Sequence, residues 1–264
     1  MRRDQLVWGI VLVLLGGLML ANAMGIRLPN GNSLMNIFWP VLLILLGAWI
    51  LLGVFLKRTP KTESASIDLQ GASEADVTIK HGAGRFALHS GAEFNELAHG
   101  AFVGGVEYKA AKNGNRLEVR MRPGTDLLSF PFAAVHHLDW DVSMNPYIPT
   151  SLELNLGATE STVDLSDMKI TGLKVKTGAS DLRMTLPLDG RFNADFEIGA
   201  ASTNLFIPDG MEARIQASLG AADLRIDQKR FPRKDGYYES ARYETSRNAI
   251  NIKISAGAAS ITIK

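Results

Sequence analysis

The stretch from Leu152 to Pro187, LELNLGATESTVDLSDMKITGLKVKTGASDLRMTLP, contains two copies of one pattern. Each copy has apolar residues at alternate positions, then a Gly-Ala pair, then a second alternating run. Alternation with a period of two is typical of a β-strand that buries one face and exposes the other. The stretch therefore predicts pairs of strands joined at a glycine corner.

The Gly-Ala pairs recur at a fixed spacing along the chain. Four of them begin 21 residues apart, at Gly157, Gly178, Gly199 and Gly220. Another begins 37 residues after the fourth, which is one period plus a 16-residue insertion, at Gly257. Less regular pairs begin at Gly82 and Gly100. A period of this length is the signature of a repeat architecture.

One such unit cannot bury its own apolar face, but stacked units can, with strands ~4.8 Å apart. Glycine permits the sharp corner, and we expect the following alanine to pack inward. Turn signals at 187–190 and 208–210 close successive units. The fixed period favours an all-β domain built as a β-solenoid-like stack of ~21-residue two-strand repeats. An antiparallel sandwich of hairpins is the alternative.

Two uncharged apolar runs stand at the N-terminus, at residues 6–26 and 37–56. At ~1.5 Å per residue, about 20 residues span the ~30 Å hydrocarbon core of a bilayer. A turn-rich loop at 27–35 separates the two runs. We therefore predict an uncleaved α-helical transmembrane hairpin, so that the protein is a multi-pass protein of the cell membrane and its first partner is the lipid bilayer.

The composition of the chain divides it into three parts. Residues 1–56 are expected to form the two-helix transmembrane region, and the polar segment 57–66 a linker. Residues 67–264 are expected to form the β-repeat domain, with a basic hairpin inserted at 229–248.

Several kinds of chemistry have no support in this sequence. The chain has no Cys and a net charge of +1, which gives no indication of thiolate chemistry or of a nucleic-acid partner. No nucleophile elbow, P-loop or dinucleotide fingerprint is present. The five histidines lack the paired spacing of a zinc site. We therefore predict no enzyme activity, no cofactor, no metal and no catalytic residue.

His81 and His99 each precede a Gly-Ala pair, in the place that Leu156, Ile198 and Leu219 take in other units. That position predicts a histidine at the edge of the core with one hydrogen bond. A role in pH sensing is the alternative, since a histidine titrates near neutral pH.

The insertion at 229–248 is rich in basic and tyrosine residues, and Asp235-Gly236 predicts a hairpin turn within it. One interpretation is a solvated flap on the stack. The other is a docking surface for an anionic membrane or an acidic partner. The candidate contact residues are Lys229, Arg230, Arg233, Lys234, Tyr237, Tyr238, Arg242, Tyr243 and Arg247.

The chain ends in an apolar alternating run, Ile261 to Lys264. We expect this run to be the last rung of the stack, because it is the last unit in the sequence. Stacked repeats need their terminal rung covered, since an edge strand offers unpaired N–H and C=O groups. The insertion or a strand from another chain could cover it. We expect the insertion to cover the end in part and the edge to be the partner site, and self-association is also possible.

The N-terminal hairpin, with Trp8-Gly9, Gly16-Gly17 and Phe38-Trp39-Pro40, resembles the LiaI/LiaF-like transmembrane region. The Gly-Ala repeat at 152–187 resembles toast-rack and LiaF C-terminal domains and adhesin-like β-repeats. This resemblance implies a membrane-anchored regulator or scaffold of envelope-stress sensing that acts on another membrane or signalling protein, with a histidine kinase as one such partner. An outward-facing binder of cell-wall polymer and a β-helix enzyme acting on glycans are the alternatives.

The distribution of Lys and Arg around the two apolar runs predicts the orientation of the β-domain. Arg2 and Arg3 precede the first run, and Lys57, Arg58 and Lys61 follow the second, whereas the loop between the runs holds one arginine. Because basic flanks stay on the cytoplasmic side, we expect both ends and the β-domain in the cytoplasm. Protease added to intact cells should then leave the β-domain uncut. Digestion from outside would reverse the orientation.

Overall fold

The computed structural model describes residues 39–40, 43–44, 47, 62–124 and 138–264. The chain divides into two compact units, Met1–Arg58 and Thr59–Lys264. Among the described residues, no helix has the length and hydrophobicity needed to cross a bilayer. The predicted spans at 6–26 and 37–56 lie outside the described residues, except for the few helical positions between 39 and 47.

The second unit is all-β, and its strands form two ladders that share the long strands β2 (Glu74–Ser90) and β7 (Thr150–Asp164). In spatial order, the first ladder contains β4 (Val106–Asn113), β5 (Arg116–Pro123), the first halves of β2 and β7, β8 (Ile170–Thr177), β10 (Arg191–Ile198), β16 (Ala249–Ala256), β12 (Glu212–Leu219), β15 (Tyr237–Glu239) and β14 (Arg233–Lys234).

In the same order, the second ladder contains β1 (Thr62–Asp68), β3 (Glu96–Val103), β6 (Trp140–Met144), the second halves of β2 and β7, β9 (Asp181–Thr185), β11 (Ser202–Phe206), β17 (Ser260–Ile263) and β13 (Asp223–Ile226). Because β2 and β7 run through both ladders, all the strands belong to one 17-stranded sheet.

The 21-residue period appears in space as parallel pairing between equivalent residues. In the first ladder, Leu154 pairs with Val175, which pairs with Phe196. In the second ladder, Val163 pairs with Met184, and the same relation continues to the next unit. The stacked arrangement is therefore confirmed over the repeats, and the sandwich of antiparallel hairpins is not found there.

A single hydrophobic core fills the space between the two ladders. The apolar residues of the alternating runs face inward from both ladders and belong to one buried cluster, and the polar residues between them are exposed or half-buried. Burying a large aliphatic side chain contributes about 1.5–3 kcal/mol. The core thus accounts for the regular alternation seen in the sequence.

The glycine corners stack directly on one another. A Cβ on Gly178 would lie 3.1 Å from the carbonyl oxygen of Gly157, and a Cβ on Gly199 would lie 2.8 Å from that of Gly178. Gly257 stands in the same way on Gly199, and Gly220 stands on Gly257. Backbone therefore approaches backbone where any other residue would place a side chain.

The expectation that the alanine after each glycine packs inward is wrong. Ala158, Ala179 and Ala200 are exposed, and the buried position is the residue after the alanine, such as Ala201. The chain bends around the core at each corner, and the outside of a bend is longer than the inside. Two consecutive residues, glycine and alanine, therefore face solvent before the alternation resumes.

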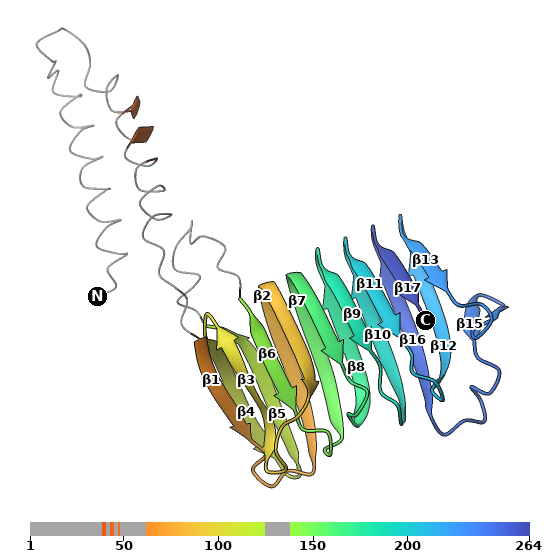
Figure 1. Ribbon diagram of the computed structural model, residues 1–264, viewed down its shortest axis with the longest axis horizontal. Helices are drawn as coiled ribbons and strands as arrows, with labels where there is room; N and C mark the ends of the chain where they lie inside the picture. The colour runs from red at the N-terminus through yellow and green to blue at the C-terminus, as the bar shows by residue number, and fades with distance from the viewer. Residues whose placement is uncertain (1–38, 41–42, 45–46, 48–61, 125–137) are drawn as a thin grey trace, which may run out of the picture. The chain divides into compact units, whose positions relative to one another are not determined.

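The expected order of the rungs is also wrong at the C-terminal end. The last unit in the sequence, β16 with β17, lies between β10 with β11 on one side and β12 with β13 on the other. The strand expected at the open end is thus paired on both sides. The terminal rung is formed by β12 and β13 instead (Figure 1).

Two further expectations differ from the structure at the other end of the stack. Strand β1 begins at Thr62 and pairs with β3, so residues 62–66 of the expected linker belong to the sheet. Gly82 takes part in the corner ladder, because its carbonyl oxygen lies against Gly157. Gly100, in contrast, lies inside the antiparallel strand β3.

The corner ladder predicts a position-specific effect of alanine. A Cβ on Gly157 would lie 2.1 Å from the carbonyl oxygen of Gly82, whereas a Cβ on Gly82 would meet no atom within 4 Å. We expect Gly157→Ala to lower the free energy of unfolding by about 1–3 kcal/mol, because the rungs must separate. Gly82→Ala is the matched control and should change it by less than ~0.5 kcal/mol. Equal losses in denaturant unfolding would contradict the close-approach argument.

Candidate functional site

The insertion at 229–248, called the flap from here on, forms a short hairpin against the terminal rung. Strands β14 and β15 pair antiparallel with each other through Arg233 and Lys234. Strand β15 then pairs antiparallel with β12 at Arg214 and Ile215. The flap therefore extends the first ladder beyond β12, and it begins directly after β13 (Figure 1).

Arg214 of β12 is the centre of the contacts that hold the flap. Its Nε donates a hydrogen bond to Glu239 Oε2 at 2.6 Å, and its other end pairs with Glu244. The guanidinium lies over the ring of Tyr243 at 4.4 Å and over that of Tyr237 at 5.3 Å. A cation between two aromatic rings and two carboxylates is held by charge and by stacking together.

The carboxylate of Glu239 is 4% exposed and pairs with both Arg214 and Lys234. Burial acts to raise the pKa of Glu239, but the hydrogen bonds from Lys234 and Arg214 outweigh it and lower this pKa. Glu239 is thus ionised in the folded protein at neutral pH. A buried charge that has two partners destabilises the fold strongly if one partner is removed.

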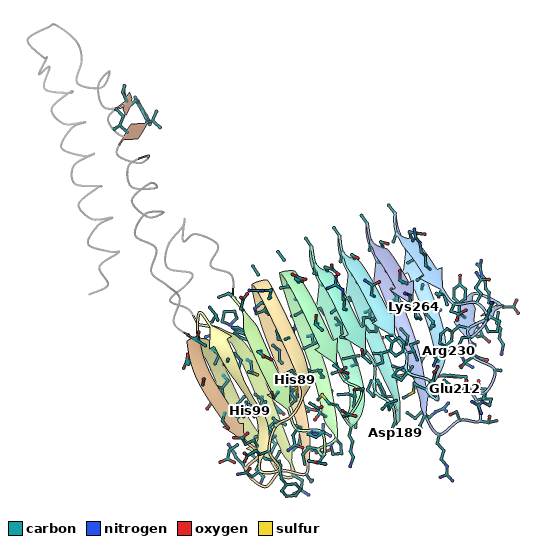
Figure 2. The ribbon with its side chains drawn as sticks, viewed as in Figure 1. His89, His99, Asp189, Glu212, Arg230 and Lys264 are labelled. Atoms are coloured by element: carbon teal, nitrogen blue, oxygen red, sulfur yellow. The ribbon has the colours of Figure 1, made fainter. Side chains whose placement is uncertain are left out.

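A second set of contacts holds the start of the flap. The Arg230 guanidinium donates to the carbonyl oxygens of Ile207, Pro208 and Met211. The next residue, Phe231, is fully buried and joins the hydrophobic core. Arg230 lies at the same end of the stack as Glu212 in Figure 2. These contacts cover the backbone of the turn that leads into β12.

The contacts that join the flap to Arg214, to Glu212 and to the turn before β12 are called the clamp, and most of the nine predicted contact residues take part in them. Arg242 pairs with Glu212 at 3.1 Å, and the guanidinium of Arg233 lies 6.0 Å from the centre of the Tyr238 ring. Tyr243 is buried, whereas Lys229 and Arg247 are exposed. That the nine residues contact a membrane or an acidic partner stays a prediction.

Two residues of the clamp, Glu212 and Arg214, are missing from the sequence-based set. Both lie on the regular strand β12, where alternating polar residues look like an ordinary solvated face. The excess of Arg and Tyr in the insertion was the available signal, since these residues stack on each other. That signal does not identify their partners on β12.

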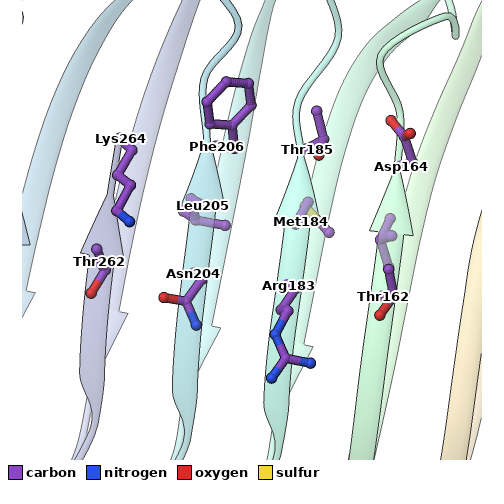
Figure 3. Close-up of a pocket in the computed structure, with 11 residues that line it drawn as sticks. Thr162, Asp164, Arg183, Met184, Thr185, Asn204, Leu205, Phe206, Thr262 and Lys264 are labelled. Atoms are coloured by element: carbon purple, nitrogen blue, oxygen red, sulfur yellow. The ribbon is translucent and has the colours of Figure 1, made fainter.

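The outer face of the second ladder carries a shallow hollow of about 240 Å³ near the ends of four strands. Its lining residues come from β7, β9, β11 and β17 and from Lys264, and Phe206 stands half exposed among them (Figure 3). The surrounding polar residues include Arg183, Asn204 and Lys264. The described residues contain no group of three His, Cys, Asp or Glu side chains arranged for a metal ion.

His81 is buried as the sequence predicts, with 2% of its surface exposed. Its Nε2 lies 2.9 Å from the carbonyl oxygen of Leu138, and its ring lies beside those of Phe86 and Trp140. Burial lowers the pKa of His81 to about 4. The interpretation as a core histidine with one hydrogen bond is confirmed.

The other histidines lie in different surroundings. His89 pairs with Asp141 at 3.0 Å and His99 with Glu96 at 3.1 Å, both near the surface (Figure 2). His136 and His137 lie outside the described residues.

Family models match both the N-terminal region and the β-domain of the chain. The family model described as the N-terminal domain of toast_rack, DUF2154, matches residues 56–206. The model described as the LiaI-LiaF-like transmembrane region matches residues 6–51, which supports membrane attachment. No curated protein gives a significant match.

One solved structure, a candidate cell adhesion protein from Clostridium sporogenes, has a similar fold. Its TM-score is 0.65 at 24% identity, and the similarity covers 78% of this chain and 99% of that chain. At this identity the similarity supports the fold alone.

Removing the Arg214 side chain should release the flap. We expect Arg214→Met to lower the free energy of unfolding by about 2 kcal/mol, because Glu239 loses one of its two cationic partners. Trypsin should then cut within 229–248 before the rest of the domain. Arg225→Met is the matched control, since Arg225 pairs with the exposed Asp223 on the surface of β13 and has no other ion pair among the described residues. Equal protection of the flap in both variants would show that Arg214 is not the clamp.

The lowered pKa of His81 predicts a loss of stability in mild acid. The unfolded chain binds a proton at His81 near pH 6.5, whereas the folded protein binds it only near pH 4. The stability contributed by neutral His81 is therefore present above pH 6.5 and falls as pH falls to 4, by about 3 kcal/mol in total. His81→Asn should remove this part of the pH dependence in denaturant unfolding. A slope identical to that of the unchanged protein would contradict the assignment.

Proposed function

The chain belongs to the toast_rack family, DUF2154, and we propose that it is a membrane-anchored regulator or scaffold in cell-envelope stress sensing that acts without enzyme activity. The single observation that carries the proposal is the order of the two matched regions. A LiaI-LiaF-like transmembrane region at 6–51 is followed within a few residues by the toast-rack domain. An anchor joined directly to a rigid β-domain suits a protein that works by contact with a partner at the membrane.

The described part of the β-domain offers surfaces of the kind that such contact needs. Outward side chains form ion pairs between neighbouring strands, as where Lys176 of β8 pairs with Glu197 of β10 at 3.0 Å. Parallel pairing along the ladders holds these side chains at fixed spacing. A rigid polar surface of this type supports specific docking at a low entropic cost.

A binder of cell-wall polymer is the second candidate, and the hollow around Phe206 favours it. An aromatic ring that is half exposed and lies between amide and charged side chains can stack on a sugar ring while its neighbours donate hydrogen bonds. The similar fold of a candidate cell adhesion protein is consistent with this alternative. The two candidates differ in the occupant they require, a protein or a glycan.

Crosslinking in membranes tests the proposal. We expect the full chain to capture a defined membrane or signalling protein, such as a histidine kinase, and residues 1–61 alone to capture none. The transmembrane region alone is the matched control, because it keeps the anchor and lacks the β-domain. Recovery of the same protein by residues 1–61 would place the contact in the membrane region. Retention of the full chain by isolated cell wall, lost in Phe206→Ala, would favour the polymer binder.

A further inference from the structure

The stack ends in a rung that is covered in only one of its two ladders. In the first ladder, β15 of the flap pairs with the outer edge of β12. In the second ladder, β13 pairs with β17 on its inner side, and no described strand pairs with its outer side. Beyond the terminal rung, the first ladder therefore continues with β15, and the second ladder has no further strand among the described residues.

The burial of the core side chains reflects this missing strand. Ile261 and Ile263 of β17 are 0% and 1% exposed. Leu224 and Ile226 pair with them in register on β13 but are only partly buried. Since Leu224 and Ile226 face the same core, the difference arises because β13 has a neighbour on one side alone.

The backbone of β13 presents unused hydrogen-bonding groups at this edge. Asp223 N–H donates to the Ala259 carbonyl at 2.8 Å, and Asp227 N–H donates to the Ile263 carbonyl at 3.3 Å. In a parallel pair, alternate residues direct both their N–H and C=O groups to the same neighbour. The N–H and C=O groups of Leu224 and Ile226 therefore point away from β17, toward the open side.

The outer face of β13 carries one acidic and one basic residue. Asp223 and Arg225 are largely exposed and pair with each other, with Arg225 Nε 3.0 Å from Asp223 Oδ2. An antiparallel strand centred on Leu224 would bring one residue opposite Asp223 and another opposite Arg225. Side chains in such non-hydrogen-bonded pairs lie close together, so opposite charges there stabilise the pairing.

We propose that β13 is a docking site for an extended segment of a partner protein, which adds to the second ladder as an antiparallel strand. The segment has an acidic residue opposite Arg225, a basic residue opposite Asp223, and branched apolar residues that face Leu224 and Ile226. Because an antiparallel strand meets Ile226 first and Asp223 last, its pattern in chain order is apolar–acid–apolar–base. Strand addition of this kind uses main-chain bonds for affinity and side chains for specificity.

The position of the flap on β12 explains why the occupant is a single strand and not a second copy of the stack. A second copy of this stack would have to bring both strands of its terminal rung against β12 and β13 together. The outer edge of β12 is already occupied by β15 at Arg214 and Ile215. One extended strand needs only β13, and it completes the level that β15 begins.

The proposed docking rests on the proposed function, because it names the surface through which the β-domain makes contact. Its test uses the full chain in lipid nanodiscs and two synthetic peptides. The first peptide, Ile-Asp-Leu-Arg-Ala-Asp, has the apolar–acid–apolar–base pattern. The second, Ile-Lys-Leu-Glu-Ala-Lys, has the opposite charges. The variant Asp223→Lys with Arg225→Glu keeps an ion pair on β13 and reverses its direction.

The unchanged protein should bind the first peptide about three- to tenfold more tightly than the second, and the variant should show the reverse preference. Amide hydrogen exchange should slow at Leu224 and Ile226 when the peptide binds. It should stay unchanged at Arg225, whose amide faces β17 in the native ladder. Absence of binding, or the same preference in both proteins, would overturn the proposal. Dimerisation of the full chain that Asp223→Lys abolishes would also overturn it, in favour of a second copy.

Recovery of partners from membranes separates this inference from the proposed function. If the charge-reversed variant captures the same protein as the unchanged chain, contact occurs elsewhere and the docking site on β13 is wrong, while the proposed function stands. If the unchanged chain captures no protein through its β-domain, the proposed function is wrong. The peptide measurements then still decide whether β13 accepts a strand.

Discussion

The contact between stacked glycine corners is the constraint on which the rest of the β-domain depends. At the repeat corners the carbonyl oxygen of one rung lies close to the place where a Cβ of the next would be, at 3.1 Å for Gly178 and 2.8 Å for Gly199. A side chain at this position would crowd the backbone of the neighbouring rung, so glycine lets the rungs keep the spacing of a β-ladder. Once the corners stack, the alternating runs on both sides align residue by residue, and their apolar side chains form one core.

The same constraint explains why the sequence predicts the rungs but not their order. Each corner recognises only backbone, so any unit with a glycine corner can stack on any other. Gly257 accordingly stands on Gly199, and Gly220 stands on Gly257, against their order in the sequence. The 16-residue excess before the last corner allows the chain to leave the terminal rung, form the flap and return one level lower. Equivalent periodic patterns contain no information about which neighbour each unit selects.

The clamp at the terminal rung shows a similar division between what sequence reasoning can and cannot supply. The composition of 229–248 identified the inserted segment and its stacking residues. Their partners Glu212 and Arg214 lie on a regular strand, and nothing distinguishes them from solvated residues such as Lys174 until the flap is placed over them. The burial of the alanines after the corner glycines was mispredicted for a similar reason. Strict alternation predicts one outward residue at each bend, whereas the structure has two.

The reversed order of the last two rungs has a consequence for stability. In a stack where each rung contacts only its neighbours, the terminal rung opens most easily, since it lacks one of two interfaces. Here that rung is β12 with β13, and its opening would expose the edges of β16 and β17, the last strands of the chain. The flap protects β12 through Arg214, while in the described part of the chain β17 is the one strand that pairs with β13. A strand bound to β13 would therefore stabilise the closed terminal rung by mass action. Binding at this edge would make β12 and β13 open less often.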